Sequence, residues 1–380
     1  MKRYPAYDPP EYADWKPDAG ALKAFRATLA ADPKRAAVLA ATTPAKHLAL
    51  YSGMLRNRLH DIALKRWVKQ GVISKAWLGT GEEAVTIGTV HALEAGDQVG
   101  PMIRNAGACH EMGMPVADML RAYLGTYDTI TRGRDLHTGD PAHGVIPPIS
   151  MVAALVPVFS GIGLAFKMQG VSKVALTWIG DGSTRTAEFH EGANFAAVQR
   201  LPVIFVIQNN QVALGTTLGQ GVAGDLRALH DLYGCEGLSC DGNNILDVYA
   251  AATLAVASCR RGDGPVFVEA ETFRMGGHAT HDEAEARATF PAALFADWGK
   301  RDPVGLYETW LVESGPRLAE DKDNREVLAE AEARIIAEVD AAAEDALKSR
   351  ATAVPPPESA IEGVYAVSAE SPVVQGKSRS

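Results

Sequence analysis

Short runs of consecutive hydrophobic residues mark the middle of the chain. The runs at 174–179, 203–208 and 266–271 have the length and composition of strands that are buried on both faces. The segments 152–168 and 186–199 are predicted to be helices, as is the segment 244–259 before the third run. Alternation of strand and helix predicts an α/β fold, a parallel sheet flanked by helices, in which ligands bind beyond the carboxyl ends of the strands.

The rest of the chain is expected to be mainly helical. Hydrophobic residues at three- and four-residue steps predict a helix over 48–68, and Thr80 is expected to cap another that has Glu82 and Glu83 in its first turn. Residues 1–45, rich in Pro and Ala, are expected to form an extended arm followed by a short helix. The charged, Ala-rich segment 324–350 predicts an outer helix.

These patterns divide the chain into four expected parts. They are an N-terminal arm (1–47), an α/β domain (48–302), C-terminal helices (303–350) and a disordered tail (351–380) that contains three consecutive prolines.

The composition of the chain limits which partners and which cellular location are expected. The 37 basic and 46 acidic residues give a net charge of −9, which argues against nucleic acid or an anionic membrane as the main partner. No run of about 18 apolar residues predicts a membrane span. Four cysteines without a CxxC pair indicate a reduced intracellular setting. Because the N-terminus has no apolar signal segment and carries early acidic residues, the bacterial cytoplasm is the expected location.

Candidate chemistry follows two of the predicted strands. Asp181, within Gly180-Asp181-Gly182, comes directly after the first hydrophobic run, and Asn209-Asn210 ends the second. Parallel strands bring these groups to one edge of the sheet, where a carboxylate and an amide oxygen can hold a hard divalent cation that in turn holds a diphosphate. The amides of Gly182 and Ser183 can add hydrogen bonds at the start of the next helix.

The same tripeptide and the same asparagine pair also occur elsewhere without this context. Gly262-Asp263-Gly264 precedes a strand and is interpreted as a plain turn, and Asn243-Asn244 as a turn or helix cap. Position after a buried strand therefore distinguishes the first pair.

The segment 180–210 resembles the thiamine diphosphate fingerprint, in which Gly-Asp-Gly is followed by Asn-Asn. More widely, residues 48–310 resemble the α subunit of the decarboxylating component of 2-oxo acid dehydrogenase complexes. Its motifs here are Gly81-Glu82-Glu83-Ala84, Leu201-Pro202-Val203-Ile204-Phe205, Asp241-Gly242-Asn243 and Gly277-His278-Ala279-Thr280. The resemblance implies the thiamine diphosphate-binding fold, with thiamine diphosphate and Mg²⁺ as cofactors.

The resemblance also implies roles for the residues of the fingerprint. Asp181 and Asn210 would be the side-chain ligands of the metal, and Val212 would donate its backbone oxygen. Gly180, Gly182 and Ser183 would lie against the cofactor and its diphosphate.

Further site residues lie outside the fingerprint. Arg104 matches the family's phosphate-binding arginine, although the family usually has Tyr where this chain has Ile103. Some relatives carry Arg where this chain has Gln208, so a fixed positive charge is missing there. His278 matches the loop histidine that contacts the diphosphate and helps the lipoyl group react, for which a pKa near neutrality is suited.

Three more positions match the region around the aminopyrimidine ring and the reacting centre. His137 matches another active-site histidine of the family, and Ser150 and Val152 match the stretch beside the ring. Animal relatives are switched off by phosphorylation of a serine directly after the loop histidine, but here that position is Ala279.

In this family a β subunit supplies the glutamate that activates the cofactor, so the chain resembles half of an active site in an α₂β₂ enzyme. The implied reaction is oxidative decarboxylation of a 2-oxo acid, with acyl transfer to the lipoyl group of an acyltransferase. The segments 70–74, 81–83 and 133–137 favour the branched-chain members, while a pyruvate or acetoin dehydrogenase subunit stays open.

Alternatives from other classes also stay in view. One is a catalytically degenerate binding or regulatory subunit, favoured by Ile103 and Gln208. A nicotinamide-dependent dehydrogenase would need Gly-x-Gly-x-x-Gly after a strand, which the chain lacks. A self-contained thiamine enzyme such as a transketolase would need a longer chain with a second cofactor-binding domain.

Overall fold

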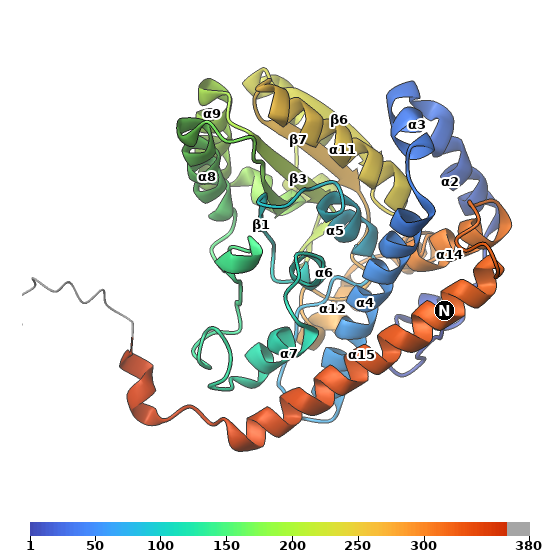
Figure 1. Cartoon of the computed structure of the whole chain (residues 1–380), viewed down its shortest axis with the longest axis vertical. Coiled ribbons are helices and arrows are strands. Elements are labelled where there is room, and N and C mark those ends of the chain that lie inside the picture. The colour runs from blue at the N-terminus through green and yellow to red at the C-terminus, as the bar shows by residue number, and fades with distance from the viewer. Residues whose placement is uncertain (363–380) are drawn as a thin grey trace, which may run out of the picture.

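The computed structural model describes residues 1–362, which are built around a five-stranded parallel sheet (Figure 1). The strand order is β1-β2-β3-β7-β6. The strands are β1 (Gln98–Gly100), β2 (Ala175–Gly180), β3 (Val203–Asn209), β6 (Glu236–Asp241) and β7 (Val266–Glu271). The three predicted strands are the three central ones, and the parallel α/β fold is confirmed.

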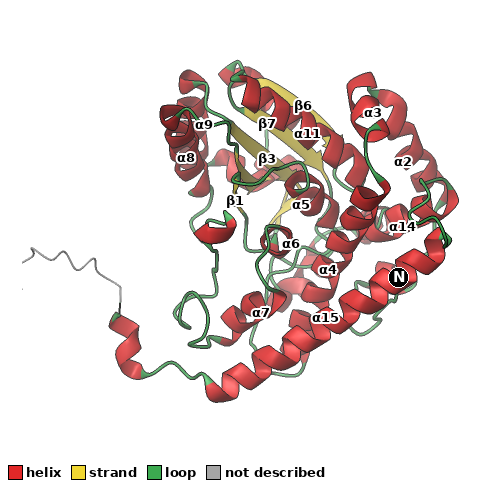
Figure 2. Ribbon diagram, in the orientation of Figure 1, coloured by secondary structure: helices red, strands yellow, loops and turns green. Residues whose placement is uncertain are grey.

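Alternate residues of the central strands face two separate hydrophobic clusters. Ile179 of β2 and Ile207 of β3 pack with helices α8 (Leu155–Gln169) and α9 (Ala187–Gln199). Trp178 and Val206 pack with α5 (Glu83–Val90) and α11 (Ile245–Arg261) instead. Figure 2 shows helices on both sides of the yellow sheet. Burial on both faces explains why the strands read as uninterrupted hydrophobic runs.

The outer strands have weaker sequence signals. β1 spans three residues, and β6 contains Glu236, Ser239 and Asp241 and is only partly buried. Neither was predicted, because a very short strand has no pattern to read and an edge strand need not be hydrophobic.

Residues 1–45 were predicted to form an extended arm followed by a short helix, and the extended arm is wrong. That segment forms α1 (Pro10–Ala13), α2 (Ala19–Ala31) and α3 (Pro33–Ala40), which precede α4 (Pro44–Lys69). The side chain of Asp18 accepts a hydrogen bond from the backbone of α2, and the side chain of Asp32 does so for α3. These caps, together with prolines in the first turn, start helices in a segment that otherwise looks irregular.

Two predicted helix starts also differ. The helix expected from 152 begins at Leu155, and the helix expected to start at Thr80 begins at Glu83 with Glu82 as its N-cap residue. The hydroxyl of Thr80 donates instead to Asp61, 3.3 Å away.

Most of the remaining helices pack against other helices rather than directly on the sheet. The remaining helices are α6 (Ala106–Glu111), α7 (Val116–Leu124), α10 (Leu218–Gly221), α12 (Glu283–Thr289), α13 (Ala292–Gly299), α14 (Pro303–Glu313) and α15 (Asn324–Thr352). The outer helix predicted over 324–350 is α15, which runs beside α4 and α7 (Figure 1).

The last described residues do not match the disordered tail expected from 351 onward. Within 351–362, α15 ends at Thr352 and the short 3-10 helix η5 (Pro357–Ile361) follows. The rest of the expected tail, 363–380, lies outside the described residues. The proposed division of the chain at 47, 302 and 350 stays a prediction. Among residues 1–362, no helix has the length and apolar character needed to cross a bilayer.

Candidate active site

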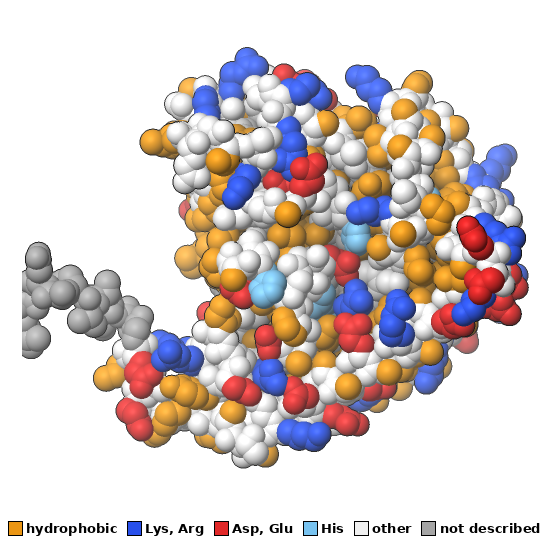
Figure 3. Space-filling model, in the orientation of Figure 1, with side chains coloured by type: hydrophobic (Ala, Val, Ile, Leu, Met, Phe, Trp, Pro, Cys, Tyr) orange, Lys and Arg blue, Asp and Glu red, His pale blue; other side chains and the backbone are white. Residues whose placement is uncertain are grey.

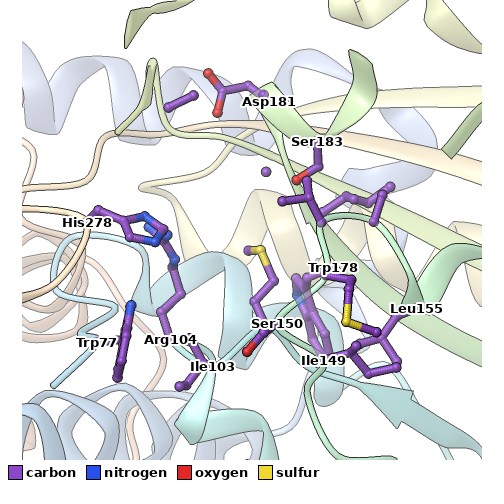
Figure 4. Close-up of a pocket in the computed structure, with 18 of the residues that line it drawn as sticks. Trp77, Ile103, Arg104, Ile149, Ser150, Leu155, Trp178, Asp181, Ser183 and His278 are labelled. Carbon is purple, nitrogen blue, oxygen red and sulfur yellow. The ribbon is translucent and has the colours of Figure 1, made fainter. Parts of the chain in front are cut away.

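A cavity of about 560 Å³ opens at the carboxyl ends of β2 and β3. Its volume is in the range of small-molecule and cofactor sites. All eleven sequence-predicted site residues line it: Arg104, His137, Ser150, Val152, Gly180, Asp181, Gly182, Ser183, Asn210, Val212 and His278. They come from segments far apart in the sequence, and Figure 4 shows Asp181 and Ser183 at one end of the view and Trp77 and Ile103 at the other.

The predicted metal donors lie directly beyond two adjacent strands. Asp181 begins the 3-10 helix η2 (Asp181–Arg185) after β2 and is 3% exposed. Burial raises the pKa of its carboxyl group, and the negative charge of Glu82 adds to this effect. Asn210 follows β3, and Val212 is two residues further on. One carboxylate, one amide oxygen and one backbone oxygen suit Mg²⁺, whereas residues 1–362 contain no cluster of three His, Cys, Asp or Glu.

Glu82 sets the orientation of the Asn210 side chain. Its carboxylate is fully buried and accepts hydrogen bonds from Asn210 Nδ2 (2.8 Å) and Gln208 Nε2 (2.6 Å). Since a carboxylate at neutral pH can only accept, the amide nitrogen of Asn210 must face Glu82. The amide oxygen accepts a 3.4 Å hydrogen bond from the backbone N–H of Val212, and its second lone pair is left for another partner, as a metal ligand requires.

The backbone around these donors is tightly packed and partly strained. A Cβ atom added to Gly182 would lie 2.6 Å from Cβ of Ala213, so this glycine is needed for the close approach of the segment that carries Val212. Gln211 and Leu214 have φ angles of 71° and 53°, in the left-handed region that non-glycine residues rarely adopt. Such strain is typical of segments that are held in place for binding or catalysis.

Two basic residues face the donors from the other side of the cavity. Arg104 Nη2 lies 3.2 Å from Nδ1 of His278, and Arg104 Nη1 lies 3.5 Å from Glu82 (Figure 4). Arg104 Nε is buried without a hydrogen-bond partner among the described residues. Because arginine can only donate, Nδ1 of His278 accepts, and the proton of the neutral imidazole is on Nε2. The pair therefore presents donors to the cavity.

A third polar group lies near the outer part of the cavity. His137 Nδ1 lies 2.7 Å from Asp135 Oδ1, and His137 Nε2 lies 3.1 Å from Ser150 Oγ. Asp135 therefore fixes the imidazole, which is positioned to exchange a proton with the Ser150 hydroxyl. The geometry links two of the predicted site residues directly.

The remaining lining is mostly hydrophobic. It includes Trp77, Ile103, Ile149, Met151 and Trp178, and Met151 is 68% exposed. A cavity with a polar end and an apolar end fits a ligand that is anionic at one end and organic at the other.

Comparisons with known proteins agree with this geometry. The family model described as "Dehydrogenase E1 component" matches residues 51–351, most of the chain. The chain belongs to the dehydrogenase E1 family.

Curated relatives within this family are α subunits. A 2-oxoisovalerate dehydrogenase subunit alpha of Bacillus subtilis (strain 168) is 33% identical over 324 residues, which cover 83% of this chain and 94% of the relative. A pyruvate dehydrogenase E1 component subunit alpha of Acholeplasma laidlawii is 30% identical over 293 residues, covering 74% and 81% respectively. A mitochondrial 2-oxoisovalerate dehydrogenase subunit alpha 1 of Arabidopsis thaliana is 30% identical over 278 residues, covering 72% and 58%.

Membership in the E1 family implies thiamine diphosphate as the cofactor, and the residues of this E1 chain fit it. Arg104 and His278 offer donors for a diphosphate, and Arg104 keeps an unpartnered N–H in the buried wall of the cavity. A buried donor without a partner is unfavourable, so it favours an anionic ligand at this place.

Sequence reasoning missed three features of the E1 site. Glu82 was read as a first-turn residue and as part of a family motif but not as a partner of Asn210, and neither Arg274 nor Trp77 was placed in the cavity. Arg274 lies four residues before His278 in the same loop, a proximity that was visible in the sequence. Whether a loop arginine is buried or solvated depends on the packing of the other segments.

The surroundings of His278 move its pKa away from the near-neutral value that suits proton transfer. Burial lowers the pKa of its imidazole to about 4, with additional lowering by the nearby Arg104 and Arg274. A lowered pKa keeps the ring neutral at pH 7, which leaves one ring nitrogen as donor and the other as acceptor.

This predicts an unusual titration of His278. In the cofactor-free enzyme, its imidazole NMR signals should stay unchanged from pH 8 to pH 5.5, where an ordinary histidine, with a pKa of about 6.5, titrates. The H278N variant assigns the signals, and the other nine histidines of the chain serve as internal references. A titration midpoint near 6.5 would contradict the buried, arginine-flanked position.

Proposed function

We propose that this chain is the α subunit of an α₂β₂ enzyme that decarboxylates a 2-oxo acid oxidatively, with thiamine diphosphate and Mg²⁺ as cofactors. The observation that carries the proposal is the meeting of Asp181, Asn210, Arg104 and His278 in one cavity at the carboxyl end of the sheet. Asp181, Asn210 and Val212 would hold Mg²⁺. Arg104 and His278, with Gly180, Gly182 and Ser183, would hold the diphosphate.

The bound cofactor supplies the electron sink that allows carbon dioxide to leave the substrate. The chain's own residues bind and orient it, and the buried walls exclude water from the polar end of the cavity. His137, held by Asp135 and linked to Ser150, is placed to take or give a proton at the outer part of the cavity.

The hydrophobic lining supports a substrate with an apolar side chain. Trp77, Ile103 and Ile149 line the cavity, and a branched-chain 2-oxo acid such as 3-methyl-2-oxobutanoate buries more apolar surface there than pyruvate does. The relatives named 2-oxoisovalerate dehydrogenase support the same choice. Pyruvate is the second candidate, because another relative of 30% identity is named for it.

The proposal includes two protein partners and a cellular location. The β subunit supplies the missing half of the site, and a lipoyl-bearing acyltransferase accepts the acyl group. Exposed hydrophobic side chains on α8 and α9, including Val158, Met168, Phe195 and Val198, support a protein partner, and orange side chains gather over these helices in Figure 3. The free state of all four cysteines supports the bacterial cytoplasm.

Co-expression of this chain with the adjacent β-type gene tests the proposal. Reduction of an artificial electron acceptor is measured with 3-methyl-2-oxobutanoate, pyruvate and acetoin, each with and without thiamine diphosphate and Mg²⁺. We expect cofactor-dependent turnover by the complex, fastest with the branched substrate, and almost none by the α chain alone. Normal turnover by the α chain alone would overturn the half-site proposal, and a stable complex that uses none of the substrates would favour a degenerate subunit.

A further inference from the structure

Arg274 is a buried cation in the wall of the cavity that no carboxylate neutralises directly. It follows β7 and is 2% exposed. Among residues 1–362, its guanidinium forms no ion pair or hydrogen bond, and both Nε and Nη2 are buried without a partner. A buried, unpaired charge is strongly unfavourable, so its presence calls for a ligand or a function.

A second positive charge nearby makes the burial of Arg274 still more unfavourable. Burial, followed by the charge of Arg104, lowers the pKa of Arg274 to about 10, so Arg274 stays positive at pH 7. Glu82, Asp282 and Asp181 attract the charge of Arg274 from a distance, and none of them forms an ion pair with it. Glu82 accepts from Gln208 and Asn210, and Asp282 Oδ1 accepts from the backbone N–H of Ala279 at 2.9 Å. Arg104 and Arg274, with the neutral imidazole of His278 beside Arg104, thus form a positively charged cluster that can bind an anion.

Gln208, which lies directly before the Asn209-Asn210 pair, adds no charge to the cavity. It is neutral, fully buried and absent from the lining. Its amide is fixed on both sides, donating to Glu82 and accepting from Asn105 Nδ2 at 3.0 Å. Gln208 therefore contributes no charge to a ligand.

We propose that Arg274 binds the diphosphate of thiamine diphosphate and supplies a second fixed positive charge beside that of Arg104. This inference rests on the proposed function, because it needs the diphosphate-bearing ligand. Arg104 and Arg274 would then act together, which explains how two neighbouring arginines can be buried in a protein with a net charge of −9.

The test compares ligand binding by the wild-type α₂β₂ complex and its R274M variant. Isothermal titration calorimetry with Mg²⁺ measures the affinity for thiamine diphosphate and for thiamine, which has no phosphate. We expect R274M to weaken thiamine diphosphate binding by about 10- to 100-fold, the effect of losing a hydrogen bond between charged groups. Thiamine binding should change by less than about twofold, because the lost charge does not face it.

Stability of the cofactor-free complex separates binding from a structural role. Removal of an unpaired buried cation should leave the thermal midpoint of R274M equal to or above that of the wild type. The R274K variant, which keeps a positive charge at this position, should retain part of the affinity. R261M is the matched control, because Arg261 is exposed and pairs with Asp263 outside the cavity, and it should bind like the wild type.

Other results would overturn the inference. Wild-type affinity in R274M would mean that Arg274 does not face the diphosphate, and an equal loss for both ligands with a lower thermal midpoint would indicate a structural role. In both cases the proposed function would stand, since the wild type still binds thiamine diphosphate. A wild-type complex that binds no thiamine diphosphate would overturn the proposed function along with the inference.

Discussion

The D181N variant is expected to lose Mg²⁺-dependent binding of thiamine diphosphate and, with it, turnover. The change keeps the size of the side chain but removes the only carboxylate in the proposed donor set of Asp181, Asn210 and Val212. Loss of a partner that merely orients a metal ligand costs about 10- to 100-fold in affinity, so loss of the charged ligand itself should cost at least about 100-fold. Calorimetric titration of the co-expressed complex measures this effect.

The chain provides a matched control in its second Gly-Asp-Gly sequence. D263N makes the same change in Gly262-Asp263-Gly264, where Asp263 is half exposed and pairs with Arg261. It should bind cofactor like the wild type. The fold of D181N should survive, because burial raises the pKa of Asp181 and a carboxyl with a raised folded pKa costs stability at pH 7. Unchanged affinity in D181N would exclude Asp181 as a ligand.

The R58M variant is expected to lose about 3–5 kcal/mol of stability, the cost of breaking a buried ion pair from one side. Arg58 lies in α4 and is 1% exposed. Its guanidinium pairs with Glu83, lies 3.0 Å from Asp302 and 4.0 Å from Asp8, and covers the ring of Tyr12. Without Arg58, buried carboxylates from three separate segments lose their shared cation. Urea unfolding of the complex, followed by circular dichroism at one protein concentration, measures the loss.

A second arginine of α4 is the control for R58M. Arg66 is partly exposed and pairs with Asp340 at 3.4 Å, so R66M should cost no more than about 1 kcal/mol. An equal effect of both variants would contradict the special role of the buried pair.

The deficit of R58M should also depend on pH. Burial by itself raises the pKa of Asp302, but Arg58 and Arg3 outweigh it and hold this pKa below its ordinary value. The wild type therefore keeps this stabilisation at pH 7 and loses it only in acid, as the pH falls through the folded pKa. In R58M the carboxylates left unpaired are protonated more easily, so the deficit relative to the wild type should shrink from pH 7 toward pH 5.

Local sequence patterns were sufficient to predict the strands that are buried on both faces and the site residues that directly follow a strand. The central strands β2, β3 and β7 were predictable because nearly all their side chains are apolar or enclosed, with Glu271 at the end of β7 as an exposed exception. Asp181 and Asn210 could be placed together because β2 and β3 are parallel neighbours, paired from Ala175 and Val203 to Gly180 and Gln208. The helices α2 and α3 were not predicted at their places, because the segment was interpreted from its Pro and Ala content and the capping residues Asp18 and Asp32 were not recognised.

The sequence by itself determined the parallel α/β fold and the edge of the sheet where the site lies, since periodicity and strand-end motifs are local properties. Only the tertiary structure decided which charges share the cavity. Glu82 and Asn210 are 128 residues apart, and Arg104 and His278 are 174 apart, yet both pairs are in hydrogen-bond contact. The burial of Arg274 is decided in the same way, because whether a charged side chain is solvated, paired or left for a ligand depends on every segment that packs around it.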